Sequence, residues 1–229
     1  MLSKLVEILF VFLLVVGVPL LSYLTARRED IRLLPRSALY FSSLLSQWFL
    51  AAAGAGVASI SFNTLGATGF KTISATDFLA WTALLTIVCL AVMGTLLFLE
   101  LRGWWPSESE LLHALLPETR LEKVWCVAGL APTAAFCEEF LYRGYLLAQL
   151  SLWLHSLTWG WAISSLAFGL AHSYQGLTGM ARAAMLGALL AYPLVHLGSL
   201  YPSMTAHFAV DAIGLAWLGP RFLRRNQPL

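Results

Sequence analysis

Seven long apolar stretches follow one another along this chain of 229 residues, with short polar segments between them. They cover approximately residues 6–24, 39–60, 78–99, 124–150, 158–173, 178–195 and 204–218. A helix that crosses the hydrocarbon core of a bilayer needs about 20 mainly apolar residues. The pattern therefore predicts an all-α fold, a polytopic transmembrane helix bundle of about seven spans.

The composition supports a membrane protein. Hydrophobic residues make up 59% of the chain and charged residues only 11%, whereas soluble domains carry roughly 25% charged residues. The net charge of +2 is too small to suggest a nucleic-acid partner. The three cysteines lie in apolar stretches without paired spacing, which argues against disulfides and against a cysteine metal site.

Two segments define the predicted organisation of the chain. The first apolar stretch is longer than the ~7 to 15 residues of a signal h-region, so we expect it to remain as an anchor. Residues 104–116 begin with an aromatic pair and a capping box at Ser107 and Glu110, which predicts an interfacial helix. We divide the chain into residues 1–123, three spans plus this helix, and residues 124–229, a four-span core, within one integral membrane domain.

The basic residues predict the orientation of the bundle. They gather after the first and third stretches, near the fifth connection and at the carboxyl end, whereas the opposite side has only Lys4 and Lys71. Cytoplasmic loops are enriched in Lys and Arg. We therefore expect the amino terminus outside and the carboxyl terminus in the cytoplasm, in a membrane such as the bacterial inner (plasma) membrane.

Two carboxylates and an arginine lie inside the fourth apolar stretch: Glu138, Glu139 and Arg143. One ionisable side chain at the bilayer centre costs at least ~2.5 to 3.5 kcal/mol, so three together indicate a functional site. Glu139 and Arg143 are four residues apart and share a helix face, whereas Glu138 points about 100° away. This predicts that Arg143 neutralises Glu139 and leaves Glu138 free to face another helix.

His172 in the fifth stretch and His207 with Asp211 in the seventh are further polar residues at depth. Glu138 and His172 are equidistant from His155, so an antiparallel hairpin that turns there would bring them level. His207 follows the turn at residues 198–202 closely and would therefore lie at a shallower depth than Glu138 and His172. We expect the fourth and fifth helices to project beyond the bilayer, which would bring the three side chains to the same depth. Together, these carboxylates and histidines could activate water and hold an oxyanion.

Each group alone also has a structural interpretation. Glu139 and Arg143 can form a plain buried ion pair, and His172 can be an interhelical hydrogen-bond donor beside a packing Phe168. A non-catalytic membrane scaffold or immunity protein, or a proton-coupled transporter with a Glu and His relay, is therefore the alternative to an enzyme. The chain shows none of the inverted repeats typical of transporters.

Three segments resemble the motifs of one family. Residues 138–144 resemble an EExxxR motif, residues 168–172 an FxxxH motif, and residues 207–211 an HxxxN/D motif of the CPBP family of intramembrane proteases. That family includes the CAAX prenyl endopeptidases and the bacteriocin-processing and immunity (Abi) proteins. The resemblance covers about residues 124–218, and Asp211 stands where eukaryotic-type CAAX enzymes usually have Asn.

The resemblance implies a hydrolase, an intramembrane endopeptidase that acts on a membrane-associated protein or peptide. It implies catalytic roles for Glu138, His172 and His207, and supporting roles for Glu139, Arg143 and Asp211. No HExxH zinc motif and no GxSG serine loop occur, which excludes the site-2 and rhomboid types of intramembrane protease.

Two mechanisms fit these residues. In the first, which we favour, Glu138 and His172 activate a water, and His207, steadied by Asp211, stabilises the oxyanion. In the second, His172 and His207 hold a zinc ion with a carboxylate, and Glu138 is the general base on the metal-bound water. The candidate metal residues are His172, His207 and Glu138. The spacing does not choose between them, because ligands from separate helices leave no sequence signature.

Overall fold

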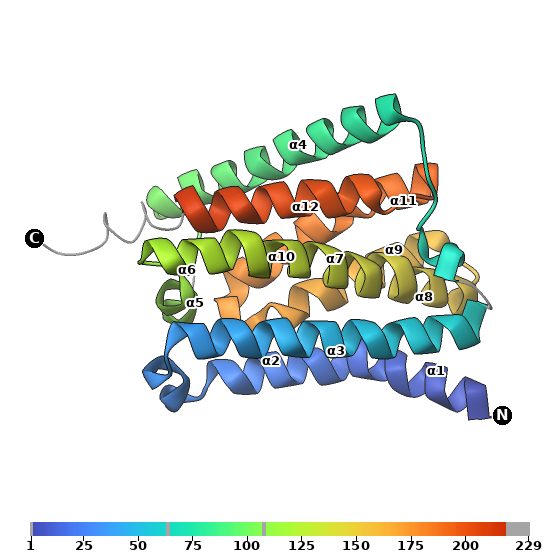
Figure 1. The fold of residues 1–229 in the computed structure, drawn as a ribbon, viewed down its shortest axis with the longest axis horizontal. Helices are drawn as coiled ribbons and strands as arrows, with labels where there is room; N and C mark the ends of the chain where they lie inside the picture. Colours follow the sequence, from blue (N-terminus) through green and yellow to red (C-terminus); the bar gives the residue numbers. More distant parts are fainter. Residues whose placement is uncertain (1, 63–64, 107–108, 219–229) are drawn as a thin grey trace, which may run out of the picture.

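The computed structural model describes residues 2–62, 65–106 and 109–218. Over these ranges the chain is helical apart from turns, short connections and one isolated bridge between Phe70 and Ser199. The all-α helical bundle predicted from the apolar pattern is therefore confirmed. Figure 1 shows the long helices running side by side along a common direction.

Among the described residues, five segments are long and apolar enough to cross a membrane: Leu2–Ala26, Arg36–Phe62, Ala75–Leu101, Arg120–Leu154 and Ser173–Leu197. The apolar helix α9, Leu157–Ala171, is shorter. Helix α12, Tyr201–Ile213, continues as the π-helix η7, Gly214–Leu218. These segments coincide with the seven predicted stretches, and five of them have full spanning length.

Several of these segments combine helices of different type. The first consists of α1 (Leu2–Phe12), η1 (Leu13–Gly17) and α2 (Val18–Ala26). The second and third are single helices, α3 (Arg36–Phe62) and α4 (Ala75–Leu101). The fourth consists of α6 (Arg120–Trp125), η4 (Cys126–Leu130), α7 (Ala131–Glu138), η5 (Glu139–Leu146) and α8 (Leu147–Leu154). The segment Ser173–Leu197, which corresponds to the sixth predicted stretch, consists of η6 (Ser173–Gln175), α10 (Gly176–Leu190) and α11 (Tyr192–Leu197).

The sequence fixes many helix starts through ordinary capping chemistry. The first turns of α11 and α12 each contain a proline, whose missing N–H is not needed there. Pro19 and Pro132 instead follow the π-helical turns η1 and η4 inside continuous helical segments. Ser74 caps α4 by accepting from the Asp77 N–H at 3.0 Å. Thr119 and Glu122 form a capping box at the start of α6.

Helix α7 lies in the interior of the bundle. It contacts α3 on one side and α12 on the other, while α12 in turn contacts α4 (Figure 1). Helix α9 packs against α8 and α10. Every residue of the π-helix η5 is buried, so the charged motif lies in the best-shielded part of the fold.

The two ends of the bundle differ in charge. The end of α2, the start of α3, the end of α4 and the start of α6 lie together at the left of Figure 1. These segments carry Arg27, Arg36, Arg102 and Arg120. Lys71 lies in the connection between α3 and α4 at the other end. The basic residues after the first and third stretches therefore lie at one end of the bundle. Arg221, Arg224 and Arg225 at the carboxyl end lie outside the described residues, and the membrane orientation stays a prediction.

Three short helices lie in the connections between the long helices: η2 (Glu29–Leu33), η3 (Leu65–Thr68) and α5 (Glu110–Leu115). Helix α5 lies within the predicted interfacial segment, and Ser107 of the predicted capping box lies outside the described residues. The Ser109 N–H donates to the Gln175 carbonyl at 3.1 Å, and its hydroxyl donates to the Tyr174 carbonyl at 2.7 Å. The segment is thus tied to the connection between α9 and α10.

The turn before α12 lies inside the protein. Ser199 and Leu200 are fully buried. The Leu200 N–H donates to the Gly69 carbonyl at 2.8 Å, beside the Phe70–Ser199 bridge, so the connection between α3 and α4 covers the turn. Because α12 starts within the bundle, His207 lies beside Glu138, with 3.9 Å between His207 Nε2 and Glu138 Oε2. The projection of the fourth and fifth helices beyond the bilayer stays a prediction.

Candidate active site

The first motif forms a buried ion pair where the helix changes type. Helix α7 ends at Glu138, and the π-helix η5 starts at Glu139; such wider turns are frequent at functional sites. Arg143 is 1% exposed and Glu139 is fully buried. Their Nη1 and Oε1 atoms are 3.3 Å apart, so the pairing predicted from the four-residue spacing is present.

Arg143 has further partners across the bundle. Its Nε–H donates to the Gly187 carbonyl on α10 at 3.3 Å. Its guanidinium carbon lies 3.9 Å from the centroid of the Phe168 ring, a cation–π contact. Phe168 of the second motif therefore does more than fill space, since it covers the charge of the first motif.

Glu138 faces two histidines from two other helices. Its Oε2 lies 3.9 Å from Nε2 of His172 at the end of α9 and 3.9 Å from Nε2 of His207 on α12. Both distances exceed those of a direct hydrogen bond. The side chains of Glu138 and His172 each retain 16% exposure, so the site is shielded but not sealed.

His172 is held by its own helix. Its Nδ1 lies 2.8 Å from the Phe168 carbonyl, which can only accept, so Nδ1 carries the proton. The Phe168 ring lies against the imidazole with ring centroids 4.6 Å apart. In the neutral ring, Nε2 therefore presents a lone pair toward Glu138.

His207 is held between two carboxylates. Its Nδ1 lies 2.8 Å from Glu139 Oε1, and its Nε2 lies 3.5 Å from Asp211 Oδ2, four residues further along α12. The spacing of the third motif predicted the contact with Asp211. The contact with Glu139 joins the first and third motifs, and no spacing in the sequence indicates it.

Gln47 is a site residue that sequence reasoning missed. It lies on α3, and its Nε2–H donates to Glu138 Oε1 at 3.2 Å. A single glutamine in an apolar stretch carries no motif, because its partner lies 91 residues away. The polar character of Gln47 within that stretch was the only available signal.

The spacing of the side chains around Glu138 bears on whether they could hold a metal ion. Across residues 2–62, 65–106 and 109–218, no group of three or more His, Cys, Asp or Glu side chains is arranged to hold a metal ion. Two donors about 2.0 to 2.1 Å from a tetrahedral zinc lie about 3.4 Å apart. Zinc at Glu138, His172 and His207 would thus require the 3.9 Å separations between Glu138 Oε2 and the two histidine Nε2 atoms to close by about half an ångström.

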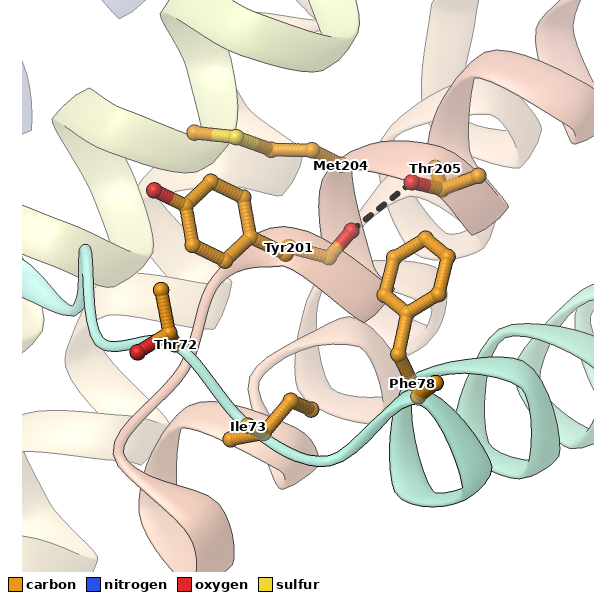
Figure 2. A pocket seen from close by; sticks show the side chains of 7 residues that line it. Thr72, Ile73, Phe78, Tyr201, Met204 and Thr205 are labelled. Carbon is orange, nitrogen blue, oxygen red and sulfur yellow. Dashed lines mark hydrogen bonds between the residues drawn. The ribbon is translucent and has the colours of Figure 1, made fainter.

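A separate open pocket of about 370 Å³ lies between the start of α4 and the start of α12. Figure 2 shows Phe78 and Tyr201 on its two sides, with Met204 beside them. Its lining contains none of the predicted site residues. This pocket is therefore distinct from the group around Glu138.

Comparison with known proteins finds a similarity over the second half of the chain. Residues 120–213 match the family model described as Rce1-like, type II CAAX prenyl endopeptidase. No curated protein and no solved structure matches the chain. The matched segment contains all three motifs, from Glu138 to Asp211. Over this segment the chain is therefore similar to the Rce1-like CAAX endopeptidases, which is consistent with the predicted resemblance to the CPBP family of intramembrane proteases.

Proposed function

We propose that this protein is an intramembrane endopeptidase that hydrolyses a peptide bond of a membrane-associated protein or peptide. The observation that carries the proposal is the position of Glu138 Oε2, 3.9 Å from the Nε2 atoms of both His172 and His207. A carboxylate and two imidazoles that converge from three helices supply a base and a donor around one point.

Glu138 and His172 activate the water. A gap of 3.9 Å between Glu138 Oε2 and His172 Nε2 is too long for a direct hydrogen bond and suits a water bonded to both atoms. Because the Nδ1 proton of His172 is committed to the Phe168 carbonyl, Nε2 accepts from that water. Glu138 takes the other proton as the water oxygen attacks the carbonyl carbon.

His207 stabilises the oxyanion. With Nδ1–H donated to Glu139, a protonated Nε2 presents its N–H toward the reacting carbonyl oxygen. Glu139 and Asp211 lie on the two sides of the ring and compensate the positive charge of the imidazolium. Arg143 in turn compensates Glu139, so the cluster is not left with an unpaired buried carboxylate.

The reaction closes with transfer of the same proton. The bond between water oxygen and carbonyl carbon forms, the C–N bond breaks, and the proton on Glu138 passes to the leaving nitrogen. The products are a carboxyl terminus and an amine, and Glu138 returns to the carboxylate. The chain's own residues supply every proton transfer in this sequence.

The partners and the membrane location of the protein are inferred from the fold and from the charge pattern. The partners are the lipid bilayer and a membrane-associated substrate, with no role for nucleic acid. We place the protein in a bacterial inner (plasma) membrane with its carboxyl terminus in the cytoplasm, supported by the basic segments at one end of the bundle.

Zinc-assisted hydrolysis is the alternative mechanism for the same endopeptidase function. His172, His207 and Glu138 would hold the ion, which would polarise the carbonyl and activate water. The Nδ1 contacts of both histidines are of the kind that orient metal ligands. The position of His207 between two carboxylates favours its use as a proton donor, and for that reason we prefer the metal-free form.

The decisive experiment is a comparison of membrane proteomes. Cells that carry wild-type protein and cells that carry Glu138→Ala are compared for membrane-associated proteins that lose a segment only with the wild type. The cleavage is then reproduced with purified protein in liposomes. A candidate substrate cleaved equally by both proteins would refute the proposal and favour a scaffold, an immunity protein or a transporter.

A further inference from the structure

Gln47 reaches the proposed base from a part of the chain that the family match does not cover. It lies on α3, whereas the match begins at residue 120. Its side-chain amide donates to Glu138 Oε1 at 3.2 Å. The two oxygens of Glu138 therefore have different partners, since Oε2 faces the two histidines.

The packing of α3 against α7 fixes the position of Gln47. The neighbouring Trp48 donates from its indole N–H to Thr133 Oγ1 at 3.2 Å. The Trp48 ring also stacks on Phe136, with ring centroids 5.4 Å apart. Both partners lie within five residues of Glu138, so these contacts set the register that brings Gln47 opposite to it.

The stabilising hydrogen bond from the Gln47 amide to Glu138 is offset by a cost at the other polar atom of the amide. Its Oε1 is buried and has no hydrogen-bond partner within the part of the chain that the structure describes. A buried acceptor without a partner carries a desolvation penalty. An aliphatic side chain of the same length would avoid this penalty and would still fill the space between α3 and α7.

We propose that Gln47 is a positioning residue that restricts proton exchange by Glu138 to Oε2. The inference rests on the proposed endopeptidase function. The Gln47 N–H must face a lone pair of Oε1, so a proton on that oxygen would oppose the donor. The proton removed from water therefore goes to Oε2, the oxygen beside His172 and His207, and leaves from there to the amine.

Two variants and a control test this role in the full-length protein in liposomes. Gln47→Met removes the donor, and Gln47→Asn keeps an amide that is one methylene too short. Both should lower kcat about tenfold or more, because a hydrogen bond to a charged group is worth a factor of this order. KM should stay within about twofold of wild type, since Gln47 acts through Glu138.

Ser46→Ala is the matched control. Ser46 is the preceding residue, and its hydroxyl donates only within α3, to the Ser43 carbonyl at 3.0 Å. We expect wild-type kcat for this variant. The melting temperature of Gln47→Met should stay close to that of wild type, because removal of the unpaired oxygen offsets the loss of the hydrogen bond to Glu138. A kcat loss accompanied by a lower melting temperature would indicate a structural role and overturn the proposal, as would wild-type kcat in Gln47→Asn.

An infrared measurement tests the contact without using activity. The carboxyl stretching band of Glu138 is assigned by its disappearance in Glu138→Gln. It should shift in Gln47→Met and stay in place in Ser46→Ala; an unshifted band in Gln47→Met would overturn the proposal. If the band shifts while the wild-type protein cleaves no peptide, the positioning of Glu138 by Gln47 stands and the endopeptidase function fails.

Discussion

His207 Nδ1 lies 2.8 Å from Oε1 of Glu139, the same oxygen that faces Arg143 Nη1 at 3.3 Å. The second carboxylate of the first motif thus has two roles, since it compensates a buried guanidinium and orients an imidazole. Changes at Glu139 should therefore affect folding and catalysis together, whereas changes at Glu138 should separate them.

We expect Glu138→Gln and Glu139→Gln to differ in their effects. Glu138→Gln should lower kcat by a factor on the order of 10² to 10⁴, the usual contribution of a general base, with little change in stability. Glu139→Gln should destabilise the protein by ~3 to 5 kcal/mol, because Arg143 loses its compensating charge. Cleavage assays and thermal unfolding of both variants check this, and wild-type cleavage by Glu138→Gln would remove Glu138 from the proposed mechanism.

Local sequence patterns anticipated much of this site. The apolar stretches located the helices within a few residues, because the length of a span follows from bilayer thickness. The four-residue spacing of Glu139 and Arg143, and of His207 and Asp211, gave contacts that the structure contains. The equal distance of Glu138 and His172 from His155 anticipated that they meet.

Contacts between distant helices were not predictable in the same way. The bond between Gln47 and Glu138 depends on the register of α3 against α7, which Trp48 and Thr133 set through tertiary packing. The buried turn at Ser199 depends on a segment more than 120 residues earlier in the chain. No local period in the sequence encodes either relationship.

Gly187→Ala should disturb the site through crowding. A Cβ at Gly187 would lie 2.9 Å from Arg143 Nη2 and 3.0 Å from Phe168 Cδ1. Overpacking of this kind destabilises by ~1 to 3 kcal/mol, and the displaced Arg143 should also lower activity. Thermal unfolding and kcat measure the two effects.

Gly56→Ala is the control for that variant. Gly56 lies in helix α3, and a Cβ there would meet nothing within 4 Å. Replacement of a helical glycine in open space should stabilise by roughly 0.5 to 1 kcal/mol. Equal stability and activity of the two alanine variants would show that Gly187 does not make room for Arg143.

Asp211 should tolerate asparagine better than alanine. Its Oδ2 lies 3.5 Å from His207 Nε2, and asparagine keeps a side-chain oxygen at this position. We expect Asp211→Asn to retain more of the wild-type kcat than Asp211→Ala, which should lose a factor on the order of 10² if His207 is left unsupported as an oxyanion donor. Similar rates for both variants would assign Asp211 to the surroundings of the site and not to its chemistry.

Chelation should leave the protein folded and active. His207 lies between Glu139 and Asp211, which suits an imidazolium that donates two protons and cannot at the same time ligate a metal. Purified protein treated with a strong zinc chelator should therefore keep its helical circular dichroism and its kcat, and elemental analysis should give clearly less than one zinc per chain. His172→Ala should be inactive, with no recovery on zinc addition. Stoichiometric zinc, together with loss of activity on chelation and recovery when zinc is restored, would instead support the metal form, in which Glu138, His172 and His207 move closer around the ion.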